Sequence, residues 1–402
     1  MSKEFIFSNI YINVFILFMN TSISDAFFES FFIPPSFISI TRLVTNLIFI
    51  LITIYYFLTK RIKLKKYLVA IIFLIFVGCT LIWTPTKFEA LKLYINFLGP
   101  CVYFILFFII NDRKKSIWIL TKYCMLVVIG DILSLTLFNS VGYMGEEGST
   151  HVIRGIHLSR STMIVYLNFC IFIFLYYLDI IKRINYKEKY KTIFFIIVCV
   201  GLIFISKSST GIVTIALFIP LLILKGKKIS KFILKISILI AVMLPLINVT
   251  SSTLNNVIVS ILGKNLTFSG RRYIWDYAIQ KLANNPLKGN GFNSTEYLLK
   301  GKVIPIYERV ASHTHNGFLE LFLQTGLVGI GLLISVILIA FRYTFYIKRS
   351  EANLIRAYFI VFIVFNFMEP YIINNIAVIV LWLPIIYLIT INNKRLREKL
   401  DE

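Results

Sequence analysis

The sequence predicts an all-α polytopic protein of about twelve membrane-spanning helices. Apolar residues make up 58% of the chain and charged residues only 15%, too little charge to cover the surface of a soluble protein of 402 residues. Apolar runs of about 20 residues, the length that a helix needs to cross a bilayer, recur between short basic clusters. We expect spans at 4–20, 37–59, 66–84, 89–111, 116–138, 161–181, 191–206, 208–225, 230–248, 316–341, 352–369 and 371–391.

The basic clusters occur in alternate connections, and this pattern predicts the orientation of the chain. The basic connections are 60–66, 113–115, 182–191, 225–231, 342–349 and the tail 394–399. The connections between them carry few cations, with Lys87 and Lys207 as isolated cases. Basic connections stay on the cytoplasmic side, so we expect an inner-membrane protein with an even number of spans and both ends cytoplasmic. The net charge of +23 therefore reflects topology, and we expect no nucleic acid as a partner.

Two long connections fall on the outer, periplasmic side of a single membrane domain spanning 1–402. The first is 139–160 and the second is 249–315. Within the second, Trp275, Ile279 and Leu282 recur at helical spacing, which predicts an amphipathic helix lying along the membrane surface. We expect the chemistry of the protein in these loops, because polar side chains collect there. All four histidines are among them: His151, His157, His313 and His315.

The histidine spacing permits a metal site but does not favour one. The pattern His313-Thr314-His315 is short, and His151 and His157 come from a different loop. The sequence contains no HExxH, GxSxG, P-loop or dinucleotide-binding motif, which argues against the common protease, hydrolase and nucleotide-dependent classes. We therefore expect neither a metal nor another cofactor.

Arginines beside these histidines point to a phosphate-bearing ligand. A guanidinium matches phosphate oxygens with two parallel hydrogen bonds and stays charged at any relevant pH. A neutral histidine can accept the proton of a hydroxyl nucleophile. The combination suggests transfer chemistry on a lipid-linked pyrophosphate at the outer leaflet. The candidate residues are His313 and His315 with Arg154, Arg160, Arg271 and Arg272.

The second outer loop resembles the O-antigen polymerase and O-antigen ligase superfamily. The resemblance rests on Ser269-Gly270-Arg271 followed by Trp275, on NPLKGNGF at 285–292, on HNGFLE at 315–320 and on GLVG at 326–329. Arg154-Gly155 before the span that opens at Ser161 is similar to the corresponding segment of the first loop. The resemblance implies a C-type glycosyltransferase fold, metal-independent transfer and a donor glycan on undecaprenyl diphosphate.

The resemblance also implies roles for individual residues. His315 would be the general base for the acceptor hydroxyl, and Arg271 would bind the leaving diphosphate. Arg154 would help to hold that diphosphate, with Arg160 or Arg272 assisting. In many members a Ser-Arg pair opens the helix after a short outer turn, whereas this chain has Ser206-Lys207. A lysine offers a point charge instead of a fork, which puts a role for this position in doubt.

Other candidates have structural alternatives. Asn316 either caps the helix that begins there or contacts substrate. Glu369 lies at the outer end of a span, where interfacial solvation competes with a role in substrate binding. His313 and Trp275 complete the set of candidate substrate-binding residues. Gly289 and Gly291 are expected in a tight turn, and Gly326 and Gly329 at close helix contacts.

The sequence thus predicts a polymerase of O-antigen or capsule repeat units. It would transfer the growing glycan from polyprenyl diphosphate to the non-reducing-end hydroxyl of another lipid-linked repeat, with a chain-length regulator as a further partner. The nearest alternative is the ligase, which transfers glycan to lipid A core or to a protein. A flippase is a second alternative, but it predicts charges along a path within the spans. Charged residues near or within the predicted spans are few and include Glu89, Asp131 and Glu369.

Overall fold

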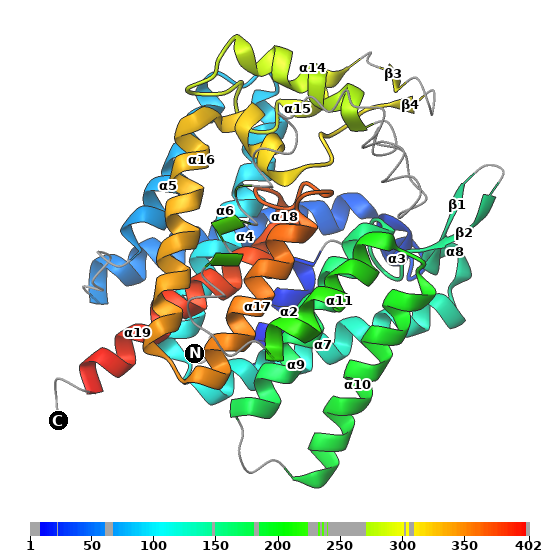
Figure 1. Cartoon of the computed structure of the whole chain (residues 1–402), viewed down its shortest axis with the longest axis vertical. Coiled ribbons are helices and arrows are strands. Elements are labelled where there is room, and N and C mark those ends of the chain that lie inside the picture. The colour runs from blue at the N-terminus through cyan, green and yellow to red at the C-terminus, as the bar shows by residue number, and fades with distance from the viewer. Residues whose placement is uncertain are drawn as a thin grey trace.

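The protein is a bundle of helices with two short hairpins (Figure 1). The computed structural model describes residues 9–21, 23–60, 67–146, 149–180, 185–223, 271–300, 303–304 and 309–398, with a few residues between 232 and 239. The elements up to the first hairpin are α2 (Ile10–Met19), α3 (Asp25–Glu29), α4 (Pro35–Lys60), α5 (Leu68–Cys79), η2 (Thr80–Ile82), α6 (Lys87–Ile110), α7 (Arg113–Thr136), α8 (Asn139–Gly142), β1 (Tyr143–Glu146) and β2 (Ser149–Ile153).

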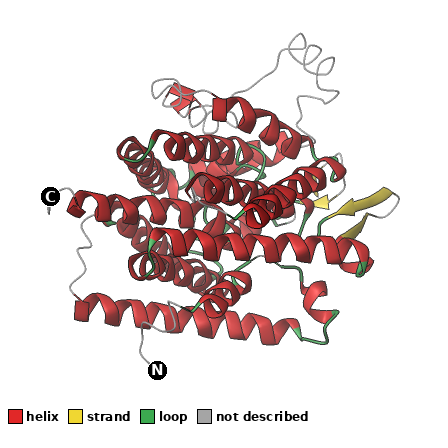
Figure 2. Cartoon of the chain, turned by 90° about the horizontal axis from the view of Figure 1, so that it is seen from below, coloured by secondary structure: helices red, strands yellow, loops and turns green. Residues whose placement is uncertain are grey.

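The second half continues the bundle and adds a cap of short elements. Its elements are α9 (Arg160–Ile180), α10 (Tyr186–Ile205), α11 (Ser209–Ile223), α14 (Arg271–Ala283), α15 (Thr295–Leu299), β3 (Val303–Ile304), β4 (Arg309–Val310), α16 (Gly317–Tyr343), η3 (Thr344–Tyr346), α17 (Arg349–Phe365), α18 (Asn375–Ala377), the π-helical turn η4 (Val378–Trp382) and α19 (Leu383–Glu398). Both hairpins, β1–β2 and β3–β4, are antiparallel, and β1–β2 projects from the edge of the bundle (Figure 2).

The helices confirm the all-α class that the apolar runs predict. Every predicted span overlaps a helix except 230–248, which lies almost wholly outside the described residues. Among the described residues, five helices are long and apolar enough to cross a membrane, and shorter apolar helices accompany them. The protein is thus a multi-pass membrane protein. The number of twelve spans and the C-type glycosyltransferase likeness stay predictions.

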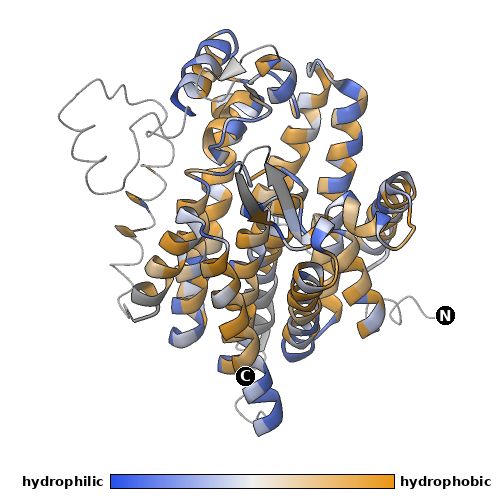
Figure 3. Ribbon diagram, turned by 90° about the vertical axis from the view of Figure 1, so that its right-hand side faces the viewer, coloured by the Kyte–Doolittle hydropathy of each residue, from blue (hydrophilic) through white to orange (hydrophobic). Residues whose placement is uncertain are grey.

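The outer faces of the bundle are apolar, as a bilayer requires. On α4 the side chains of Phe37, Leu51 and Leu58 are 62%, 66% and 77% exposed, respectively, although all three are large hydrophobic residues. Figure 3 shows the bundle as mainly hydrophobic, with hydrophilic residues over the cap and at the end of α19. Exposed apolar surface of this extent is explained by contact with lipid tails.

Contacts between α9 and the α17 segment distinguish the two ends of the bundle. Antiparallel α9 and α17 define them, since the Ser350 hydroxyl donates to Asp179 at 3.0 Å at one end and the Ser161 hydroxyl donates to Glu369 at 2.7 Å at the other. Arg113 pairs with Glu351 at the first end. The described parts of the basic connections lie at this first end, which we call the basic end. The opposite end carries the cap of α14 and α15.

The amphipathic helix predicted in the second loop is present as α14, and its position along the membrane surface stays a prediction. Its apolar face is covered by protein: Trp275, Ala278 and Leu282 pack against Leu319 and Leu323 of α16. The helical spacing of apolar residues identifies a face that must be buried, and here α16 buries it instead of lipid.

Two of the glycine motifs pack against each other. Gly289 and Gly326 both have positive φ angles, of 70° and 66°, which favour glycine. A Cβ at Gly289 would meet the backbone of Gln324 and Gly326, and a Cβ at Gly326 would meet the backbone of Leu287. The turn after Pro286 therefore docks directly onto a kink in α16. This contact fixes the cap on the bundle.

Candidate active site

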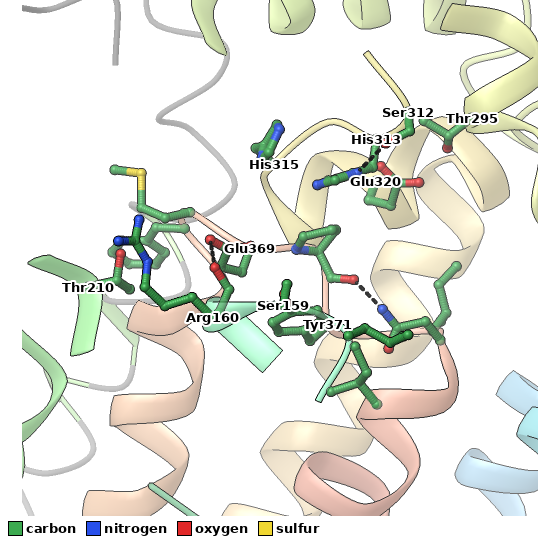
Figure 4. Close-up of a pocket in the computed structure, with 18 of the residues that line it drawn as sticks. Ser159, Arg160, Thr210, Thr295, Ser312, His313, His315, Glu320, Glu369 and Tyr371 are labelled. Atoms are coloured by element: carbon green, nitrogen blue, oxygen red, sulfur yellow. Dashed lines mark hydrogen bonds between the residues drawn. The ribbon is translucent and has the colours of Figure 1, made fainter. Parts of the chain in front are cut away.

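A cavity of about 1150 Å³ opens at the capped end of the bundle (Figure 4). Its walls come from segments far apart in the sequence: the start of α9, the turn between α10 and α11, the start of α14, residues 292–296, residues 312–324 and the loop after α17. Among its lining residues are the polar side chains Arg42, Arg160, Lys207, Arg271, Asn293, Thr295, Glu296, His313, His315, Glu320, Gln324 and Glu369.

The loop that carries the two histidines is held from both sides through Thr314. The Trp275 indole N–H donates to the carbonyl of Thr314 at 2.8 Å. The amide of Thr314 donates to the Glu320 carboxylate at 2.9 Å. Thr314 is fully buried, whereas His313 and His315 on either side of it both line the cavity. Satisfying both backbone groups of the central residue thus directs its neighbours into the cavity.

The two histidines lie together and are both neutral near pH 7. Their ring centroids are 4.1 Å apart, and the Ser312 hydroxyl lies 2.8 Å from Nδ1 of His313. Burial, His313 and Arg271 together lower the pKa of His315 to about 3. Burial and Arg271 lower the pKa of His313, whereas Glu320 acts in the opposite direction. Nδ1 of His315 is buried, and it has no hydrogen-bond partner among the residues that the structure describes.

Cations and a carboxylate face the histidines from the other side of the cavity. Nη2 of Arg271 lies 3.8 Å from Oε1 of Glu369, which also accepts the Ser161 hydrogen bond. Nη1 of Arg271 lies 2.8 Å from the Met368 sulfur. Burial raises the pKa of Glu369, while Ser161, Arg271 and Arg160 act against that rise. Arg160 and Arg271 therefore both act electrostatically on Glu369.

Two helix N-termini open into the same region. Ser159 precedes α9 and its hydroxyl accepts from the amide of Thr162 at 3.2 Å. Ser208 precedes α11 and accepts from the amide of Gly211 at 3.3 Å. Both serines line the cavity, as does Lys207, which adopts a φ of 51° at the turn between α10 and α11. Helix N-termini carry partial positive charge, so this side of the cavity is suited to an anion.

The structure brings five of the predicted site residues to the cavity: Arg160, Arg271, His313, His315 and Glu369. Two other predicted residues do not line the cavity but hold the segments that do. Trp275 positions the histidine loop, and Asn316 caps α16 by accepting from the amides of Phe318 at 3.0 Å and Leu319 at 2.9 Å. The capping role considered for Asn316 is confirmed.

Arg154 and Arg272 are not among the lining residues. The Arg154 side chain donates to the carbonyls of Val141 at 2.8 Å and Ser140 at 3.3 Å, near the base of the first hairpin. Arg272 pairs with Asp276 one turn along α14, at 2.9 Å. Their predicted role at the diphosphate stays a prediction, and both contacts are what a structural role requires.

Among the described residues, His157 does not join His313 and His315 in a group of metal ligands. His157 is fully buried, 3.4 Å from the carboxylate of Asp131, and stacks on Tyr166. The side chain of His151 lies outside the described residues. Among the side chains that the structure describes, no three histidines, cysteines or carboxylates are grouped as metal ligands.

Several cavity residues were not singled out from the sequence. Glu320 and Gln324 follow Asn316 at intervals of four residues, which places them along one face of α16. That spacing, directly after the histidine loop, could have identified both residues as candidates for the site. Arg42 and Thr295 gave no such signal, because nothing local connects them to the loop.

Comparison with known proteins bears on the half of the cavity formed by α10, α11, α14 and α16. Residues 192–334 match a family model described as O-antigen ligase. The resemblance to the O-antigen polymerase and ligase superfamily is confirmed. The matched segment contains Lys207, Arg271, His315 and Glu320. Arg160 and Glu369 complete the cavity from outside it.

Two curated relatives share part of the sequence. The exopolysaccharide production protein ExoQ of Rhizobium meliloti (strain 1021) is 33% identical over 94 residues, which are 21% of this chain and 21% of the relative. A putative polysaccharide ligase of Rickettsia bellii (strain RML369-C) is 34% identical over 73 residues, 17% of this chain and 18% of the relative. The matched stretch thus spans about a fifth of the length of these relatives. Both names concern polysaccharides, in line with the O-antigen superfamily.

Proposed function

We propose that this protein is a polymerase of bacterial surface polysaccharide. It transfers a growing glycan from undecaprenyl diphosphate to the non-reducing-end hydroxyl of another lipid-linked repeat unit. The observation that carries this proposal is that one cavity is lined by a neutral histidine, His315, and by Arg271, which lowers the pKa of that histidine. A base for a hydroxyl and a cation for a diphosphate are the two functions that the transfer needs.

In the proposed step, His315 acts as the general base. The acceptor hydroxyl gives its proton to the imidazole while its oxygen forms a bond to the anomeric carbon of the donor glycan. The bond from that carbon to the diphosphate oxygen breaks, and undecaprenyl diphosphate leaves with the electron pair. The proton then passes from His315 to solvent. Because its pKa is lowered, His315 is unprotonated at neutral pH when the step begins.

Arg271 and Arg160 stabilise the leaving diphosphate in this proposal. Both line the cavity beside Glu369, and Lys207 adds a third cation at the start of α11. The N-termini of α9 and α11 supply backbone dipoles of the same sign. Preorganised positive charge of this kind acts on the charge that develops as the glycosidic bond breaks.

We further propose that the cavity faces the periplasm of the inner membrane. The basic end of the bundle, marked by the pair of Arg113 and Glu351, lies opposite the cavity. Basic connections remain in the cytoplasm, so an opposite end is periplasmic. Lipid-linked repeat units on that side would serve as donors, so the reaction would need no nucleotide sugar.

The ligase is the second candidate, because the matching family model is described as O-antigen ligase and one relative as a putative polysaccharide ligase. The donor side of the cavity serves both reactions equally. The two differ in the acceptor, which in a ligase is lipid A core or a protein. A deletion strain separates them: without a polymerase single repeat units still become attached, whereas without a ligase none do.

The test is the glycan profile of a deletion strain complemented with variants. His315→Ala should abolish long chains while the protein remains inserted, since loss of a general base costs about 100-fold or more in rate. Arg271→Gln should shorten the chains similarly. Arg342→Gln is the matched control, because Arg342 is exposed at the basic end. Normal chain length in the His315→Ala strain would refute the assignment.

A further inference from the structure

The cavity has two chemically different walls (Figure 4). The first, the cationic wall, consists of Arg160, Lys207 and Arg271. The second, the amide wall, consists of Asn293, Thr295, Glu296, Glu320 and Gln324. In Figure 4, Arg160 and Thr210 lie on one side and Thr295 and Glu320 on the other, with His315 between them. The base of the proposed reaction thus stands where the two walls meet.

Arg271 and Glu320 act on the pKa values of the histidines in opposite directions. Arg271 is 3.8 Å from Glu369 and lowers the pKa of both histidines. Glu320 raises the pKa of His313.

The amide wall is a preorganised hydrogen-bonding surface. The side-chain N–H groups of Gln324 donate to Glu320 at 2.8 Å and to Thr295 at 3.1 Å. The amide oxygen of Gln324 accepts from the backbone N–H of Asn293 at 2.9 Å. Glu320, Gln324 and Thr295 are only 8%, 6% and 2% exposed. Mutual hydrogen bonds hold these side chains in place, so a ligand need not order them on binding.

The groups on this wall match the hydroxyls of a sugar. Carboxylate oxygens accept from hydroxyls, a threonine hydroxyl donates and accepts, and a side-chain amide does both. Among the cavity-lining residues of 292–296 and 317–324, all of which are described, there is no lysine or arginine. Two carboxylates, on Glu296 and Glu320, stand there instead. A diphosphate or a sugar carboxylate would meet repulsion on this wall.

We propose that the amide wall binds the acceptor sugar and selects an uncharged sugar or an amino sugar over a uronic acid. The inference rests on the proposed function, since it assigns the second substrate of that reaction. The donor diphosphate takes the cationic wall, and the acceptor hydroxyl reaches His315 from the side of Glu320. The cations of one wall and the carboxylates of the other thereby keep each substrate from binding in the place of the other.

The first test uses the repeat units that accumulate in a deletion strain. The sugar at their non-reducing end is identified by mass spectrometry after release from the lipid. A neutral or amino sugar is the expected result, and a terminal uronic acid overturns the proposal. The chain length of the same strain tests the proposed function separately, because persistence of long chains would contradict the polymerase whatever the terminal sugar is.

The second test is kinetic, with the full-length protein reconstituted in phospholipid vesicles. The accumulated repeat unit is the donor, and isotope-labelled acceptor is offered either as the native repeat unit or after oxidation of its primary alcohols to carboxylates. Wild type should favour the native acceptor by about tenfold or more in kcat/KM. Glu320→Gln and Glu296→Gln should each weaken this preference, because each removes one repelling charge.

Matched variants make the outcome specific. Glu29→Gln is the control, since Glu29 is exposed on α3 and does not line the cavity. Arg160→Gln should raise KM for the donor without changing the acceptor preference. Equal use of the two acceptors by wild type overturns the proposal, as does an unchanged preference in both glutamate variants. If wild type transfers glycan to neither of the two acceptors, the proposed function itself fails.

Discussion

The indole N–H of Trp275 donates a 2.8 Å hydrogen bond to the carbonyl of Thr314, the residue between the two cavity histidines. Trp275 is four residues after Arg271 on α14, so one helix carries both an arginine of the cavity and the side chain that fixes the histidine loop. The spacing of Arg271 and Trp275 in the sequence thus has a physical reason. It couples the position of the cation to that of the base.

Trp275→Phe should reduce transfer with a smaller effect on the fold. The phenyl ring keeps much of the packing against Leu319 and Leu323, but the buried Thr314 carbonyl loses its donor, which costs about 1–3 kcal/mol. We expect the transfer rate to fall about tenfold. Initial rates in vesicles check this, with Trp118→Phe on α7 as control, because Trp118 is 36% exposed. An unchanged rate would mean that the hydrogen bond does not position the loop.

The pH dependence of the rate should reflect the low pKa of His315. Because that pKa is lowered to about 3, the imidazole is unprotonated well below the ordinary value of 6.5. Transfer should therefore persist on acidification to about pH 5. Arg271→Gln removes one cause of the lowering, so its acid limb should move upward. Rates between pH 4 and 8 test both, and a wild-type inflection near 6.5 would contradict the prediction.

The same lowering predicts how stability changes with pH. In the unfolded chain His315 takes up a proton as pH falls through 6.5, whereas the folded protein does not until about pH 3. The unfolded state then binds more protons, so the fold loses stability as pH falls below 6.5. His315→Ala should lose less on acidification than wild type does. Melting temperatures in detergent at pH 7.5 and 5 measure the difference, and equal losses in the two proteins would exclude this contribution.

The helices and the histidine loop could be predicted from the sequence because their causes are local. Bilayer thickness sets the length of an apolar run, and the expected spans accordingly fall on helices such as α6 and α9. His315 and Arg271 were found through a motif within one loop. The cap of α16 followed from an asparagine at the start of an apolar run.

The rest of the cavity depends on packing between distant segments. Arg160 and Lys207 reach it only because α9 and α11 begin side by side, and no local periodicity encodes that arrangement. The face of α14 was identified correctly, but whether lipid or α16 covers it depends on the tertiary fold. Arg154 lies in one of the loops predicted to carry the site, yet it does not line the cavity. Its side chain donates to two backbone carbonyls near β1.

Gly326→Ala should destabilise the protein, whereas Gly331→Ala on the same helix should not. Gly326 has a φ of 66°, and an added Cβ would meet the backbone of Leu287. Its ψ of −168° puts Gly326 in a backbone region that is essentially restricted to glycine, which costs an L residue about 1–3 kcal/mol, and the clash adds to that cost. A Cβ at Gly331 meets nothing within 4 Å, so alanine there should be neutral or stabilising. Melting temperatures compare the two, and an equal effect of both substitutions would exclude a close contact at Gly326.

Glu369→Gln should lower kcat without raising KM for the donor. The glutamine can still accept the hydrogen bond of Ser161, but it no longer attracts Arg271, which is 3.8 Å from the carboxylate. A less fixed Arg271 should stabilise the leaving diphosphate less well, so kcat should fall several-fold. At the same time a negative charge is removed from beside Arg271 of the cationic wall, which favours binding of an anionic donor. Separate kcat and KM values in vesicles decide the matter. A large increase in KM would show instead that the carboxylate itself contacts the donor, as a hydrogen-bond acceptor for its sugar.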